Sequence, residues 1–260
     1  FWLVYELTES PLYLGFVGLA NAIAGIALNL FGGVFADKFD KRKLIIFTQL
    51  TTAGLIFLLS FLTVSGLINV WHILLIALIT GAVNAFDQPA RQALYPHLIN
   101  RSVMVSAVAL NSAIWQGTRI ITPALAGYII AAIGTSSTFF IAGAGFAIMA
   151  IVIYLLHIPH IETSGGNPLH DMVDGLKFIK QDSAFWFLIG MSFFNSFFGM
   201  AYINMMPAIT VDILNLGADA QGSLLSAGGV GAFVVTMLLG SKSNFRHTGI
   251  FIIGGGTIFG

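Results

Sequence analysis

The sequence predicts an all-α integral membrane protein. Its 260 residues are 57% hydrophobic and only 8% charged, and its mean hydropathy is +0.90. A soluble domain carries charge on about a quarter of its residues. The few charged residues lie between long uncharged stretches, and about 20 apolar residues of helix are enough to cross a bilayer. Composition and charge spacing together therefore indicate several transmembrane helices.

The uncharged stretches predict seven complete helices. They are expected over 12–36, twice within 44–86 with a division at 66–70, twice within 102–161 with a division near 134, over 183–211 and over 220–241. Residues 1–8 and 247–260 predict one partial helix at each end of the chain. We therefore expect the sequence to be a piece of a longer membrane protein.

The basic residues predict the orientation of these helices. Ten of the eleven lie in alternate connections: Lys38, Lys41, Arg42 and Lys43; Arg91 and Arg101; Lys177 and Lys180; Lys242 and Arg246. The intervening connections contain none. Because Lys and Arg accumulate in cytoplasmic loops, these four connections and the N-terminus are predicted to be cytoplasmic.

A polar segment over 158–183 divides the chain into a part over 1–157 and a part over 184–260. Apolar residues at helical spacing after Asn167 and Pro168 predict an amphipathic helix on the cytoplasmic surface within this linker.

The second part also repeats the first at a shift of 204 residues. The shift aligns Gly18 with Gly222, Gly25 with Gly229, Lys38 with Lys242 and Arg42 with Arg246. Parallel repeats of this kind predict a protein built from two similar helical bundles.

The connection over 33–43 carries the most specific pattern in the chain. A small residue is followed by an acid and by basic residues at fixed spacing: Gly33, Asp37, Lys38, Lys41 and Arg42. This pattern resembles motif A of the major facilitator superfamily, with Asp40 in place of the family's central glycine. The resemblance implies two six-helix bundles in the full protein. It also implies a conformational switch in which Asp37 and Lys41 join Asp87 in a charge cluster. A basic loop that only sets the topology is the alternative.

Two further stretches resemble the same superfamily. Residues 87–112 resemble its branch of bacterial siderophore exporters and macrolide efflux proteins. Residues 119–127 resemble motif C of the efflux-type members, which kinks a helix at the interface between the halves. Here the resemblance implies that Pro123 kinks the helix and that Gly127 allows close helix contact, with Thr122 in place of a glycine.

Polar residues inside the predicted spans are candidates for a substrate or coupling cavity: Arg119, Gln116, Asn21 and Asn195. Arg119 lies about 22 Å along its helix from Met104, because each helical residue rises about 1.5 Å. A guanidinium at this depth needs a cavity or a partner. Glu6, a residue outside the sequence or an anionic substrate group are the candidate partners. An arginine satisfied by carbonyl groups and water is the alternative.

These observations predict a secondary active transporter, and specifically an exporter of amphiphilic small molecules that works by alternating access. The resemblance implies coupling to protons, a bacterial inner membrane and a monomer. An enzyme is not expected, since the sequence has no catalytic motif, and no cofactor or metal is expected from its histidine spacing and its lack of cysteine. The equal numbers of basic and acidic residues argue against a nucleic acid partner. A seven-helix receptor or channel is the alternative.

Overall fold

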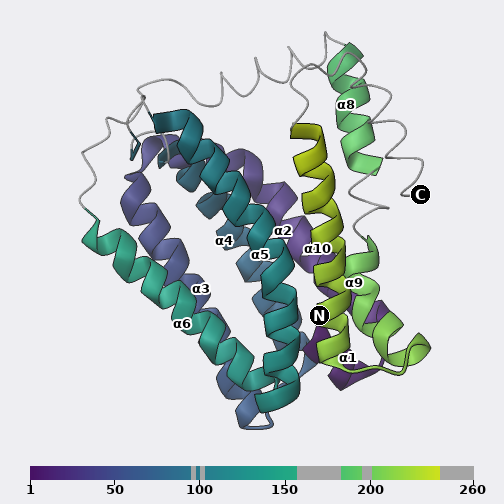
Figure 1. Cartoon of the computed structure of the whole chain (residues 1–260). Coiled ribbons are helices and arrows are strands. Elements are labelled where there is room, and N and C mark those ends of the chain that lie inside the picture. The colour runs from purple at the N-terminus through teal and green to yellow at the C-terminus, as the bar shows by residue number, and fades with distance from the viewer. Residues whose placement is uncertain (95–97, 100–102, 157–182, 195–200, 241–260) are drawn as a thin grey trace.

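The computed structural model describes residues 1–94, 98–99, 103–156, 183–194 and 201–240, and all of its regular elements there are helical. The chain runs up and down through α1 (Trp2–Thr8), α2 (Pro11–Lys38), α3 (Lys41–Val64), α4 (Val70–Leu94), α5 (Met104–Ile133), α6 (Thr135–Leu155), α8 (Ser183–Phe194), α9 (Ala201–Ala208), the π-helical turn η4 (Ile209–Ile213) and α10 (Ala218–Gly240) (Figure 1). The predicted all-α membrane fold is confirmed.

The observed helices follow the predicted ones closely. α1 is the partial helix at the start of the chain, and α2 to α6 are the next five. Four of the described helices are long and apolar enough to cross a bilayer, over Pro11–Asn29, Lys41–Val64, Val70–Leu94 and Thr135–Leu155. The predicted helix over 183–211 corresponds to α8, α9 and η4. The amphipathic helix predicted in the linker and the partial helix over 247–260 lie outside the described residues.

The connection over 33–43 differs from the predicted loop, because most of it is helical. α2 continues through Asp37 to Lys38, and α3 begins at Lys41. Only Phe39 and Asp40 lie between the two helices. The chain can reverse over two residues because Asp40 caps the start of α3 with its side chain.

The two ends of the helices differ in charge. We call the end that holds the α2–α3 connection the Arg42 end. The opposite end, which holds the α1–α2 connection and the start of α10, is called the Glu9 end. Lys41, Arg42, Lys43 and Arg91 belong to the Arg42 end, together with Asp40 and Asp87. The described charged residues of the Glu9 end are all acidic: Glu6, Glu9, Asp212 and Asp219.

Helices distant in sequence pack in pairs: α2 along α4, α3 along α6, and α5 along α10. Glycines make the closest of these contacts. A Cβ on Gly32 would lie 1.9 Å from the main-chain oxygen of Ala85, and one on Gly81 would lie 2.5 Å from that of Asn21. Real side chains do not approach a backbone this closely, so both positions of the α2–α4 pair require glycine.

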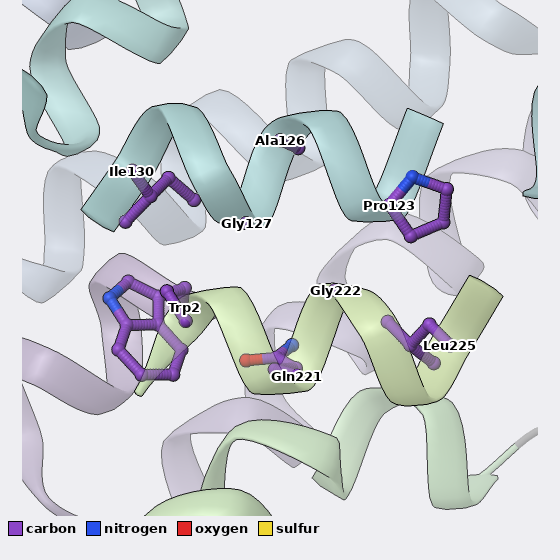
Figure 2. Close-up of a pocket in the computed structure, with 9 residues that line it drawn as sticks. Trp2, Pro123, Ala126, Gly127, Ile130, Gln221, Gly222 and Leu225 are labelled. Carbon is purple, nitrogen blue, oxygen red and sulfur yellow. The ribbon is translucent and has the colours of Figure 1, made fainter. Parts of the chain in front are cut away.

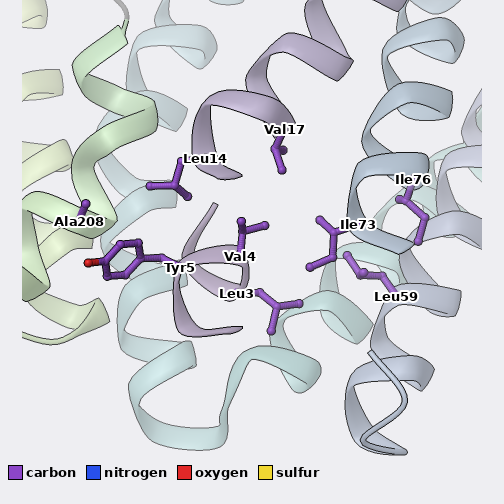
Figure 3. Close-up of a cluster of buried hydrophobic side chains, with 9 residues drawn as sticks. All are labelled: Leu3, Val4, Tyr5, Leu14, Val17, Leu59, Ile73, Ile76 and Ala208. Carbon is purple, nitrogen blue, oxygen red and sulfur yellow. The ribbon is translucent and has the colours of Figure 1, made fainter. Parts of the chain in front are cut away.

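A core of buried apolar side chains joins α1, α2, α3, α4 and α9 toward the Glu9 end (Figure 3). Its buried members are Leu3, Val4, Tyr5, Leu14, Val17, Leu59, Ile73, Ile76 and Ala208. Many other large apolar side chains point outward, including Phe47, Phe61, Trp71 and Phe140, which are at least 60% exposed. An exposed apolar surface of this extent suits a lipid environment and would be unstable in water.

The α2–α4 contact gives a prediction about stability. Gly81→Ala should destabilise the full-length protein, because the added methyl group meets the backbone of α2 at Asn21. Gly54→Ala is the matched control, since nothing lies within 4 Å of its Cβ position on α3. This control should be neutral or stabilising by about 0.4–1 kcal/mol. Thermal unfolding of both variants in detergent measures the difference, and equal unfolding temperatures would contradict the close contact.

Candidate functional site

Asp40 organises the backbone at the Arg42 end. Its carboxylate accepts hydrogen bonds from the main-chain N–H groups of Arg42 and Lys43, at 3.0 and 3.3 Å. These N–H groups are among the four that a helix start leaves without an internal partner. The sequence comparison with motif A treated Asp40 only as a replaced glycine. An aspartate four positions before Leu44, the first residue of the next uncharged stretch, was the available signal for a cap.

Arg42 reaches from the first turn of α3 to the last turn of α6. Its Nε donates a hydrogen bond of 3.2 Å to the carbonyl oxygen of Ile153, and its Nη2 donates to that of Tyr154. The guanidinium carbon also lies 5.9 Å from the centre of the Tyr154 ring. A helix end leaves its last carbonyl groups unpaired and carries partial negative charge. Arg42 therefore stabilises the end of α6, immediately before the linker segment.

Asp87 is buried between α3 and α4, with its residue 8% exposed. One carboxylate oxygen lies 2.6 Å from Thr48 Oγ1 and 3.0 Å from Gln49 Nε2. The other forms a 2.6 Å ion pair with Arg91 Nε, one turn later on α4. Both oxygens thus have polar partners, which a buried carboxylate requires. Thr48 and Gln49 were not identified from the sequence as partners of Asp87, because residues of two helices become neighbours only after packing.

The structure describes part of the predicted switch. Lys41 is 8% exposed and Asp87 is buried at the same end of the helices. Within the described residues, the ion-pair partner of Asp87 is Arg91, and no ion pair joins Asp87 to Lys41. The side chains of Asp37 and Lys38, and the packing around Gly33, lie outside the described part. The predicted cluster of Asp37, Lys41 and Asp87 therefore stays a prediction.

α5 and α10 form a close seam across the boundary between the two parts of the chain. A Cβ on Gly127 would lie 2.4 Å from the carbonyl oxygen of Ala218, and one on Gly222 would lie 2.3 Å from that of Pro123. A cavity of about 110 Å³ lies in this seam, and Figure 2 shows the residues around it. The cavity is lined by Trp2, Pro123, Ala126, Gly127, Ile130, Ala218, Gln221, Gly222 and Leu225.

Pro123 lies inside α5, directly before a residue whose main chain is hydrogen-bonded to α10. The N–H group of Ala124 donates a 3.0 Å hydrogen bond to Oγ of Ser226 on α10. Ser226 is buried, with 9% of its residue exposed. Sequence analysis identified Pro123 and Gly127 but missed Ser226. The signal that could have found it is the run of small residues at helical spacing on α10: Ala218, Gly222, Ser226 and Gly229.

The predicted cavity residues do not gather around the seam cavity. Arg119 is exposed, Gln116 is partly buried, and Asn21 lies where α2 meets Gly81 of α4. Asn195 lies outside the described residues. The carboxylate of Glu6, a candidate partner of Arg119, accepts a hydrogen bond of 3.2 Å from Thr135 at the Glu9 end. These residues remain predicted contacts of a cavity.

A second cavity, of about 620 Å³, opens at the Glu9 end between α1 and the end of the α9–η4 segment. Its lining includes the carboxylates of Glu6, Glu9 and Asp212. The other lining residues are Trp2, Tyr5, Val211 and Asn215. In the part of the chain that the structure describes, no group of three or more histidine or acidic residues has an arrangement that could hold a metal ion.

The contacts of Arg42 give a second prediction. Arg42→Gln should weaken the last turn of α6, because it removes a charge-assisted cap that is worth about 1–2 kcal/mol. Lys43→Gln removes the same charge from the next residue, which is exposed, and is the matched control. Hydrogen exchange of the amides over 152–156 should accelerate in the first variant alone. Equal acceleration in both would show that net charge, rather than the geometry at Ile153 and Tyr154, stabilises this turn.

Comparison with known proteins places the whole described bundle in one family. Residues 1–248 match the family model described as transmembrane secretion effector, of the major facilitator superfamily. The staphyloferrin A transporter of Staphylococcus aureus is 26% identical over 92% of this chain and 60% of its own length. Macrolide efflux protein A of Streptococcus pyogenes is 21% identical over 94% of this chain and 62% of its own length.

The enterobactin exporter of Shigella boydii is 23% identical over 91% of this chain and 58% of its own length. The chain thus spans about 60% of the length of these curated relatives. The all-helical fold, the apolar outer surface and a family match that covers nearly every residue agree with one another. The chain belongs to the transmembrane secretion effector family of the major facilitator superfamily.

Proposed function

We propose that the whole protein is a secondary active exporter that moves amphiphilic small molecules across a bacterial inner membrane by alternating access. The α5–α10 seam is the observation that carries this proposal. It joins a helix before the linker to a helix after it through backbone groups and small side chains. An interface of this kind lets two helical units meet closely and still separate, which alternating access requires.

In this proposal residues 1–157 form the N-terminal half, 158–183 a cytoplasmic linker and 184–260 the start of the C-terminal half. The Arg42 end faces the cytoplasm, because basic residues mark cytoplasmic connections. The charge difference between the Arg42 and Glu9 ends supports this orientation. The protein acts as a monomer without a cofactor, and protons are the proposed coupling ion.

The conformational switch is proposed at the Arg42 end. Gly33, Asp37, Lys38, Lys41 and Arg42 form its loop and helix ends, and Asp87 is its acid on α4. The buried positions of Lys41 and Asp87 support this proposal, since charged groups are seldom buried unless they are paired. Arg42 adds a link to α6, so movement of this connection would reach the start of the linker.

The names of the relatives suggest the substrate class. Staphyloferrin A, macrolides and enterobactin are named for three of them. We propose a substrate with an apolar body and polar groups. Arg119, Gln116, Asn21 and Asn195 are its proposed contacts in the cavity of the whole protein, and Arg119 meets an anionic group. A seven-helix receptor receives no support from these relatives, which are named as transporters.

The orientation can be tested with single cysteines, because the 260 residues contain none. A membrane-impermeant maleimide added to intact cells should label Asn69→Cys at the Glu9 end and leave Lys43→Cys unlabelled until the cells are opened. Both positions are exposed, so access of the reagent rather than burial decides the result. Lys41 is a poorer site because it is buried. Labelling of Lys43→Cys in intact cells would invert the proposed topology.

The transport activity can be tested with the full-length protein in vesicles, by following an anionic siderophore and a macrolide with and without a pH gradient. Gradient-driven movement of either compound supports the proposal, and movement of neither by a correctly inserted protein contradicts it.

Arg119→Ala should abolish transport and Arg119→Lys should restore part of it, since lysine keeps the charge and loses the planar donor fork. Arg119→Met, which is uncharged and of similar length, is the matched control. Full transport by this variant would make the arginine structural.

A further inference from the structure

The seam between α5 and α10 contains a backbone defect. Pro123 has no N–H group, so it cannot bond to the carbonyl group of Arg119 one turn earlier, and its ring keeps that carbonyl away from the helix axis. A Cβ on Gly229 of α10 would lie 2.9 Å from this Arg119 oxygen. The absence of a side chain at Gly229 therefore lets α10 approach α5 where the internal bonding of α5 is interrupted.

The next N–H group of α5 has a partner on another helix. The N–H group of Ala124 donates to Ser226 Oγ at 3.0 Å. The space around this bond is tight, because a Cβ on Gly222 would lie 2.3 Å from the Pro123 oxygen and 3.2 Å from the Ala124 Cα. A backbone donor in the membrane interior needs a protein partner or a water-filled cavity. While the seam is closed, the hydroxyl of Ser226 is a protein partner of the Ala124 N–H group.

We propose that Ser226 is a positioning residue of the transport cycle, which stabilises the conformation with α5 and α10 closed by completing the backbone of α5 at Pro123. This inference rests on the proposed alternating-access function. The bond crosses from the part before the linker to the part after it, so it exists only while the two helices are in contact. When the seam opens, water can reach both groups and the advantage is lost. The serine therefore shifts the balance between closed and open forms and needs no contact with the substrate.

The chain offers a matched control on the same helix. Ser223 lies three residues before Ser226 and is exposed, and its hydroxyl donates to the carbonyl of Asp219 within α10 at 2.9 Å. Ser223→Ala removes the same atom as Ser226→Ala and leaves the seam untouched. Ser226→Thr keeps the hydroxyl. Pro123→Ala removes the ring that displaces the preceding turn, so the Ala124 N–H group can bond within α5 to the Ile120 carbonyl oxygen and depends less on Ser226.

The test measures distances in the full-length protein without substrate. Spin labels on cysteines at Ile133 and Leu216, both exposed at the Glu9 end, report the separation of α5 and α10. Ser226→Ala should raise the ratio of open to closed forms about three- to twentyfold, the range expected for one hydrogen bond between membrane helices. Ser223→Ala and Ser226→Thr should leave the ratio within about twofold of the wild type. In the Pro123→Ala background, Ser226→Ala should change it by less than about twofold.

Two results would overturn the inference. One is an equal change in the ratio of open to closed forms in Ser226→Ala and Ser223→Ala. The other is a change in this ratio from Ser226→Ala that is the same in the wild-type and the Pro123→Ala backgrounds. If Ser226→Ala does not assemble, the Pro123→Ala/Ser226→Ala double variant decides. Its assembly supports the role of Ser226, and its failure contradicts it. These distances do not depend on transport. If the effect of Ser226→Ala depends on Pro123 in a protein that transports no tested compound, this inference stands and the proposed substrate class fails. If the protein transports and the effect does not depend on Pro123, this inference fails and the proposed function stands.

Discussion

The need to satisfy backbone polar groups away from water is the constraint on which this structure depends. Lipid offers no hydrogen bonds, so each main-chain N–H and C=O group in a span must find a partner inside the protein. Regular helices meet this need along most of their length. The difficult places are the helix ends and the proline in α5, and at each of them the structure uses a particular side chain. Asp40 serves the start of α3, Arg42 the end of α6, and Ser226 the interior of α5.

The basic connection between α2 and α3 combines two conflicting requirements. Basic residues mark the cytoplasmic side of a membrane protein, yet the start of a helix carries partial positive charge and disfavours them. Here Lys41, Arg42 and Lys43 occupy the first turn of α3. The structure resolves the conflict by placing Asp40 before them and by directing Arg42 to the carbonyl groups of α6, where positive charge is favourable.

Close packing follows from the same constraint, because apolar side chains gain little by leaving lipid for one another. Helices in a membrane associate through contacts that need short distances, and small residues provide them. The α2–α4 pair uses Gly32 and Gly81, and the α5–α10 pair uses Gly127, Gly222 and Gly229. The first pair lies within one predicted half, whereas the second joins the two predicted halves. The same means of packing therefore occurs within one predicted half and also at the boundary where alternating access is proposed.

The sequence alone determined the all-helical fold and the order and apolar character of the helices from α1 to α6, and it pointed to the family, because these follow from composition, charge spacing and local motifs. It placed Pro123 and Gly127 on one helix, and Asp87 near a helix end. It could not show that Asp87 contacts Thr48 and Gln49, that Arg42 caps α6, or that Ser226 meets Ala124. Each of these contacts joins residues at least 38 positions apart. Local propensity carries no information about such pairs, so only the packing of the helices against one another decided them.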